Sequence, residues 1–176
     1  MRTDADFAFG LARAGIPLLA IPSAAEPGPI PPGPGELLAG LAASPDPLFR
    51  ICTVPLLLTR PEVVAIAEET AQGLPAGDRA AFLHLYEAAV CLRRLWKTRL
   101  AMRVNPLHEV PDLFSRDLGL PPPEDSYGEP CLAEIGRRFE TGEAGARIRG
   151  IETMLAHLME QTFSLLYREP AGAPAR

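Results

Sequence analysis

The sequence predicts an all-α fold, a single helical domain of about five to seven helices in which two long helices pack together. The first observation is the stretch from Asp78 to Val104, which lacks Gly and Pro over 27 residues and is rich in the helix formers Ala, Leu and Arg. The second is the segment from Ala144 to Glu169, where apolar residues recur every three or four positions. The third is that no part of the sequence has the alternation and turn residues of a β-hairpin.

The chain of 176 residues has the length of one domain. We place a proline-rich extended N-terminal arm at residues 1–34, the helical domain at 35–169 and a C-terminal tail at 170–176. Within the arm, Asp6 to Ala14 is expected to form a short helix. Residues 17–34 contain seven prolines in eighteen positions, and this run favours an extended polyproline conformation because proline fixes φ and lacks an N–H donor. It fits either a solvated linker or a strand that binds an aromatic groove on a partner.

Three short helices are expected before the first long one: Glu36–Ala43, Leu48–Val54 and Arg60–Gln72. Asp46 is a suitable N-cap for the second of these, with Pro47 at its first position. Pro55 is expected to end that helix and to leave Leu56–Leu58 as a buried connection. Thr59 and Glu62 have the spacing of a capping box and should start the third helix.

The long helix from Asp78 to Val104 is expected to form the centre of the core. Its apolar residues make one broad stripe at helical spacing: Phe82, Leu85, Tyr86, Ala89, Leu92, Trp96 and Leu100. Its second half carries five basic residues and no acidic one, and they flank the apolar ridge: Arg93, Arg94 and Lys97 on one side, Arg99 and Arg103 on the other.

Two interpretations of this basic ridge are open. The long side chains can cover the apolar residues while their charges remain solvated. Alternatively, an apolar centre with a charged rim can form a face for a protein partner. We therefore predict a partner-binding surface made of six residues: Arg93, Trp96, Lys97, Arg99, Leu100 and Arg103.

The chain after Val104 is expected to be irregular until a second capping box, Ser126 with Glu129, starts a helix that ends near Glu140. The last helix is predicted to run from Ala144 to Glu169. Its apolar spacing is that of a helix–helix seam. It should therefore lie along the central helix as the other half of the core, or form a dimer contact.

The net charge of −5 hides a segregation of charges along the chain. Residues 79–103 hold six basic residues and one acidic residue, whereas 1–78 and 104–145 each hold nine acidic residues against four and three basic ones. A nucleic-acid-binding domain is more often basic overall. Nucleic acid is therefore an unfavoured partner, although Trp96 beside Arg93 and Lys97 leaves single-strand binding open.

The three cysteines, Cys52, Cys91 and Cys131, are about 40 residues apart and match neither a zinc motif nor a disulfide framework. We expect reduced, buried thiols in a cytoplasmic protein. No apolar run approaches the roughly 18 residues of a membrane-spanning helix, so no membrane association is expected. No cofactor is predicted either, because no phosphate-binding glycine loop or dinucleotide fingerprint is present.

The pattern H-x-x-E occurs twice and provides candidate metal ligands: His84 with Glu87, and His157 with Glu160. If their helices were antiparallel neighbours, the four side chains could converge in a helical bundle. The order is the reverse of the Glu-x-x-His of di-iron bundles, and His/Glu pairs at this spacing are common as surface contacts. We therefore predict no metal, with these four residues as the only candidates.

The expected function is a non-enzymatic one: a protein-binding or assembly subunit, or an adaptor, of a cytoplasmic complex. Its partner would be another protein or a second copy of the chain. The alternative is a small metal-dependent helical-bundle enzyme, and the third hypothesis is a helical subunit that binds single-stranded nucleic acid. An enzymatic role stays open but unfavoured, since the sequence holds no complete catalytic motif such as G-x-S-x-G.

Overall fold

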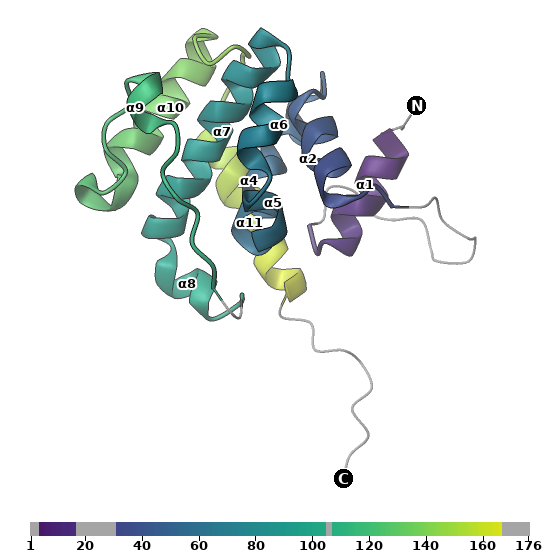
Figure 1. The fold of residues 1–176 in the computed structure, drawn as a ribbon. Coiled ribbons are helices and arrows are strands. Elements are labelled where there is room, and N and C mark those ends of the chain that lie inside the picture. Colours follow the sequence, from purple (N-terminus) through teal and green to yellow (C-terminus); the bar gives the residue numbers. More distant parts are fainter. Residues whose placement is uncertain (1–3, 17–30, 105–106, 167–176) are drawn as a thin grey trace.

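A central helix, α7 (Ala76–Leu95), runs through the middle of the molecule and packs against α4 (Thr53–Thr59) and α10 (Glu129–Thr141) (Figure 1). The computed structural model describes residues 4–16, 31–104 and 107–166. Within these ranges every regular element is a helix, so the predicted all-α, single-domain fold is confirmed. None of the described helices is both long and apolar enough to cross a bilayer.

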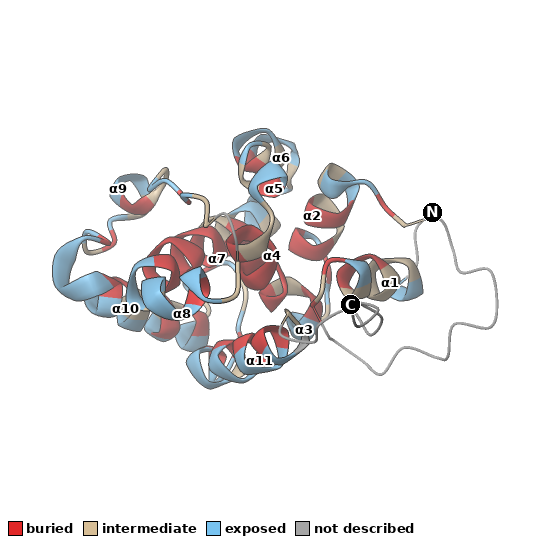
Figure 2. Ribbon diagram, turned by 90° about the horizontal axis from the view of Figure 1, so that it is seen from below, coloured by how far each residue is buried: buried red, intermediate tan, exposed pale blue. Residues whose placement is uncertain are grey.

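The core surrounds α7 on several sides, as its apolar stripe predicted. Phe82, Leu85 and Tyr86 are fully buried, and the buried residues of α7 continue into those of α4 (Figure 2). These large side chains contribute most to the buried apolar area around α7, and each fully buried one stabilises the fold by about 1.5 to 3 kcal/mol relative to an exposed position.

The N-terminal helix α1 (Asp4–Arg13) packs against α2 (Pro34–Ala42). Leu11 and Ile16 are fully buried, and the ring of Phe7 occupies the space that a side chain at Gly40 would need. Residues 4–16, which the sequence placed in an arm, are therefore packed on the helical domain. The expected polyproline conformation of 17–30 lies outside the described residues.

Of the two helix caps predicted before the central helix, one is confirmed and the other is wrong. At α3 (Pro47–Ile51), Asp46 accepts a hydrogen bond from the backbone N–H of Leu48 at 2.9 Å, so this N-cap is confirmed. At α5 (Pro61–Val64) the capping box is wrong, because the Thr59 hydroxyl donates instead to the carbonyl of Pro55 at 2.7 Å.

Pro55 does not end a helix, contrary to the prediction. It occupies the first turn of α4, where a missing backbone N–H costs nothing because no intrahelical acceptor is available there. Leu56–Leu58 are consequently helical and buried. The helix expected over 60–72 is split into α5 and α6 (Ala67–Gly73) at Ile66, whose φ and ψ are −108° and 5°.

The helix predicted over Asp78–Val104 is also broken, between α7 and α8 (Lys97–Ala101). Trp96 at the break has φ −105° and ψ 22°. Its ring meets that of Phe163 edge-on, with 6.3 Å between ring centroids, while Leu100 is fully buried. The break thus directs both side chains into the fold.

The C-terminal part contains α9 (Ser115–Leu118), the 3₁₀ turn η1 (Asp125–Gly128), α10 and α11 (Ile151–Leu166). The predicted last helix starts later than Ala144, because Gly145 and Gly150 have left-handed φ values of 81° and 65°. It packs on α3, α4 and α10, and Phe163 meets the ring of Trp96 just beyond the end of α7. The prediction that it lies along the central helix is not confirmed, and the alternative of a dimer contact stays a prediction. Together these breaks produce shorter and more numerous helices than predicted.

Candidate functional site

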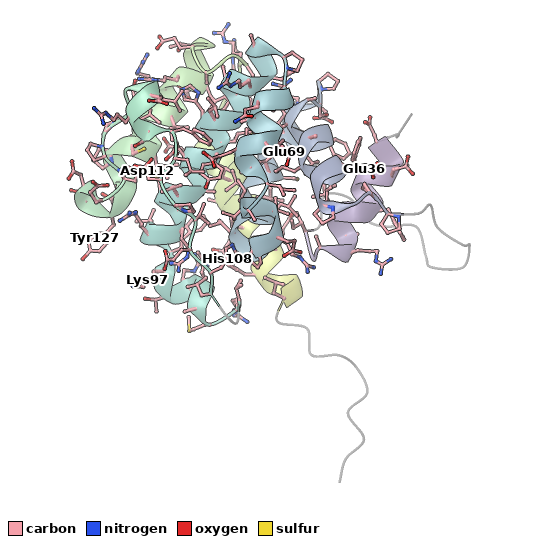
Figure 3. The ribbon with its side chains drawn as sticks, viewed as in Figure 1. Glu36, Glu69, Lys97, His108, Asp112 and Tyr127 are labelled. Carbon is pink, nitrogen blue, oxygen red and sulfur yellow. The ribbon has the colours of Figure 1, made fainter. Side chains whose placement is uncertain are left out.

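A hollow of about 520 Å³ lies at the end of α7, where α8 begins and η1 lies alongside. We call it the cationic hollow. Lys97 and Tyr127, which both line it, lie on the same side of the molecule (Figure 3). Its lining combines basic, acidic and apolar side chains: Val90, Arg93, Arg94, Leu95, Lys97, Thr98, Glu109, Val110, Glu124 and Tyr127.

The three basic residues of the hollow have different surroundings. Arg93 is buried, donating from Nε to the carbonyl of His108 at 2.8 Å and pairing with Glu109 at 3.1 Å. Arg94 and Lys97 are exposed, and across residues 4–16, 31–104 and 107–166 no side chain forms an ion pair with either of them. The hollow therefore offers two uncompensated cations to an incoming anion.

Two apolar side chains border these cations. Tyr127 is 75% exposed and Leu95 is 36% exposed. Large apolar residues that gather beside charges on a surface are typical of protein-interaction sites.

The backbone that presents Tyr127 is strained. Ser126 and Tyr127 have φ values of 45° and 59°, and in the described part of the chain they are the only non-glycine residues with positive φ. Each such residue costs roughly 1 to 2 kcal/mol. The adjacent Gly128 lies so close to α7 that a Cβ built there would be 3.0 Å from Cα and Cβ of Cys91. The turn is thus held tightly on α7, with Tyr127 facing solvent.

One wall of the hollow comes from residues 107–114, which we call the strap. Buried polar side chains hold it in addition to Arg93. The Tyr86 hydroxyl donates to the carbonyl of Pro111 at 3.1 Å, and Nε2 of His108 donates to the carbonyl of Leu57 at 2.8 Å. The strap is therefore tied to both α4 and α7.

Glu87 makes the remaining attachment of the strap to α7. Its side chain is fully buried, and Oε1 accepts the backbone N–H groups of Phe114 at 2.8 Å and Leu113 at 3.3 Å. No donor in the described part of the chain contacts Oε2. Burial raises the pKa of Glu87 to about 8, the Asp112 carboxylate acts in the same direction, and the two N–H groups oppose it. Glu87 is therefore protonated at neutral pH.

This protonation makes stability depend on pH with a defined sign. As pH rises from about 4.5 to 8, the unfolded chain loses the proton of Glu87 while the folded protein retains it, so stability falls and then levels off. We expect Glu87→Gln to stabilise the protein by about 1 to 3 kcal/mol at pH 8 and much less at pH 5. Urea denaturation at both pH values measures this, with the exposed Glu140→Gln as control. An equal gain at both pH values would contradict the assignment.

The four candidate metal ligands do not converge. His84 is buried, with Nδ1 donating to the carbonyl of Ala80 at 2.8 Å, and burial lowers its pKa. His157 is exposed beside Gln161 at 3.0 Å, and Glu160 pairs with Arg99. Among the residues that the structure describes, no group of three potential metal ligands is found. The arrangement differs from the one considered from the sequence because His84 and Glu87 are buried in the core whereas His157 and Glu160 are exposed on α11.

The six predicted partner-binding residues lie in different environments. Lys97 is exposed and lines the hollow. Arg93 and Leu100 are buried, and Arg93 also lines the hollow. The Arg99 guanidinium lies 5.9 Å from the Trp96 ring centroid and 5.2 Å from that of Phe163.

Arg103, the sixth residue, is half-buried. Sequence reasoning missed Leu95 and Tyr127 as members of the site and treated Arg94 only as part of the basic ridge. The sole signal for Tyr127 was an aromatic residue next to a glycine.

The cysteines are free and buried, as expected. Burial raises the pKa of the Cys52 thiol, and a hydrogen bond with Cys131 is the largest cause of the raised pKa of Cys91. These thiols therefore stay protonated and have the character of core residues.

Comparisons with models of known families, with curated proteins and with solved structures gave no match. The fold and the site define an all-α domain with a hollow that combines uncompensated cations and exposed apolar side chains. Its function is therefore argued from this geometry.

Proposed function

We propose that the protein is a non-enzymatic binding subunit that holds an acidic segment of a protein partner in the cationic hollow. The observation that carries this proposal is the strained turn at Ser126 and Tyr127. It holds an exposed aromatic ring at the edge of a hollow whose cations Arg94 and Lys97 form no ion pair with any residue that the structure describes. Backbone strain of this kind clusters at ligand-binding sites, where it fixes a side chain in its binding position.

The composition of the hollow favours a protein segment over nucleic acid. Tyr and Arg are the residues that most often dominate the energy of protein interfaces, and both are present with the apolar Leu95. Glu109 and Glu124 also line the hollow, so its positive charge is confined to Arg94 and Lys97 and does not form the extended field that a phosphate backbone needs. An acidic peptide can place one carboxylate between Arg94 and Lys97 and an apolar side chain against Tyr127.

The other two hypotheses have less support. A metal-dependent enzyme needs ligands that meet, and His84 and Glu87 are buried away from the exposed His157 and Glu160. Single-strand binding relied on Trp96, whose ring packs on Phe163. The four candidate ligands therefore do not form a metal site. The packed Trp96 ring is not a free stacking surface for a nucleic-acid base.

A photocrosslinking amino acid at position 127 tests the proposal. Placed there in the native host, it should give a discrete protein adduct, because Tyr127 borders the proposed contact. Adding Arg94→Glu and Lys97→Glu should weaken the adduct about tenfold or more, since a charged rim steers and holds an acidic partner. The same amino acid at Gln72, exposed on α6, is the control. An adduct that survives charge reversal, or an adduct with nucleic acid, would overturn the proposal.

A second variant separates the ring from its backbone. Tyr127→Asn removes the aromatic side chain but suits the left-handed conformation, which Asn tolerates better than most residues. We expect folding stability to stay within about 0.5 kcal/mol, while affinity for the partner identified by crosslinking falls about tenfold or more. Unchanged affinity would show that the ring is not part of the contact.

A further inference from the structure

The strap lies between the hollow and a buried carboxyl group, and this placement points to regulation of the site. Its residues Glu109 and Val110 line the hollow, while the backbone N–H groups of Leu113 and Phe114 bind Glu87. We propose that the strap is a pH-controlled wall, closed while Glu87 is protonated and released when its carboxyl group ionises. This inference rests on the proposed function of the hollow.

The two N–H contacts at Glu87 would strengthen on ionisation, but ionisation also removes the proton that Glu87 shares with the Asp112 carboxyl of the strap and leaves two facing negative charges. The side chain is fully buried, and no donor among the described residues contacts Oε2 to stabilise a negative charge. A buried, unpaired charge is strongly unfavourable. Ionisation therefore favours any movement that admits water, and an irregular segment of eight residues (107–114) is easier to move than a helix of the core.

The groups that face Glu87 add repulsion and supply no compensating cation. From the strap, Asp112 carries a carboxylate that accepts from Ser115 N at 3.1 Å and from its hydroxyl at 2.6 Å. On α7 itself the neighbours are the neutral Tyr86 hydroxyl and the Cys91 thiol, and α6 contributes the acidic Glu68 near Tyr86.

α10 and α4, two other elements packed around α7, also provide no described cation free to pair with Glu87. From α10, the thiol of Cys131 faces Cys91, and the α10 cation Arg138 is engaged with the carbonyls of Leu118 at 2.7 Å and Gly119 at 3.2 Å. α4 has no titratable side chain. Ionised Glu87 would thus face the Asp112 carboxylate with no described side chain of opposite charge beside it.

Release of the strap would change the hollow directly. Movement of Leu113 and Phe114 away from α7 displaces Pro111 and the wall residue Val110, and it loosens the contact of Glu109 with Arg93. A wall that retreats removes one side of the binding surface. The hollow should therefore be formed at neutral pH and lost in alkaline solution.

Hydrogen exchange of the strap amides tests this without any partner. Protection factors of the Leu113 and Phe114 amides, corrected for the intrinsic effect of pH, should fall about tenfold or more in wild type between pH 6.5 and pH 9. Glu87→Gln should keep them constant, because Gln retains the acceptor oxygen and cannot ionise. Amides in the middle of α10 serve as internal controls and should keep their protection.

Two further variants sharpen the test. Asp112→Asn removes the facing charge and should move the loss of protection to a higher pH or abolish it. Glu109→Gln, on the strap but with its side chain directed to Arg93, should leave the transition in place. The inference is overturned if wild type shows no transition, or if Glu87→Gln shows the same one. That result would leave the crosslinking test of the hollow unaffected, and failed crosslinking would leave the exchange result standing.

Discussion

Replacing Gly145 with Ala should lower the free energy of unfolding by about 3 kcal/mol. Gly145 has a φ of 81°, and a Cβ at this position would lie 2.5 Å from the carbonyl oxygen of Gly77 and 2.8 Å from Cβ of Ala80. The left-handed conformation costs about 1 kcal/mol for a residue other than glycine, and overlap with backbone that cannot move alone adds about 2 kcal/mol. Chemical denaturation measures the change.

Gly142 provides a matched control for this substitution. Its φ of 89° is similar, but a Cβ there has nothing within 4 Å. Gly142→Ala should therefore cost only the conformational part, about 1 kcal/mol. The difference between the two variants isolates the close approach between the α10–α11 connection and the first turn of α7. Equal costs would mean that this contact is not formed in solution.

Two adjacent arginines should respond very differently to truncation. Arg93→Ala should destabilise the protein by about 2 to 3 kcal/mol, because it leaves the carbonyl of His108 without its donor and removes a buried side chain that ties the strap to α7. Arg94→Ala should change stability by less than about 0.5 kcal/mol, since Arg94 is exposed and has no recorded partner within the described residues. Thermal or urea unfolding of both variants at pH 7 gives the comparison.

The two arginine variants also distinguish an effect on folding stability from an effect on partner binding. If Arg94 serves the hollow, Arg94→Ala should weaken crosslinking from position 127 while leaving the unfolding midpoint unchanged. A destabilised Arg94→Ala variant, or a fully stable Arg93→Ala variant, would show that the two arginines have been assigned to the wrong environments.

The parts of the fold that were predictable from sequence are those set by local chemistry. The stretch from Asp78 lacks helix breakers, and its apolar residues share a face, so a buried central helix followed. Asp46 followed by Pro47 is a strong signal for the start of a helix, and this N-cap was confirmed. These features depend on neighbouring residues in the chain, which a sequence displays directly.

The features that the sequence did not reveal arise from contacts between distant segments. No Gly or Pro marks the break at Trp96; its side chain packs on Phe163, which is 67 positions away in the chain (163 − 96). The spacing of Ser126 and Glu129 matched a capping box, yet Gly128 is the N-cap and Ser126 is left-handed. Tertiary packing overrode local preference in both cases.

The basic ridge shows the same limit for the candidate site. Helical spacing placed Arg93 and Arg94 on the same side of the ridge, but it could not show that the strap covers Arg93 and leaves Arg94 exposed. The strap is irregular and has no periodicity from which its register on α7 could be read. The sequence alone therefore could not predict that Arg93 is buried and Arg94 is exposed.

The break at Trp96 has a practical consequence, because this is the only tryptophan in the chain. Its indole is half-buried between the α7–α8 junction and α11, with the Arg99 guanidinium over the ring. The intrinsic fluorescence of the unlabelled protein thus comes from one known position. Its emission wavelength should report whether the C-terminal helix is docked, because the ring contacts Phe163 of that helix.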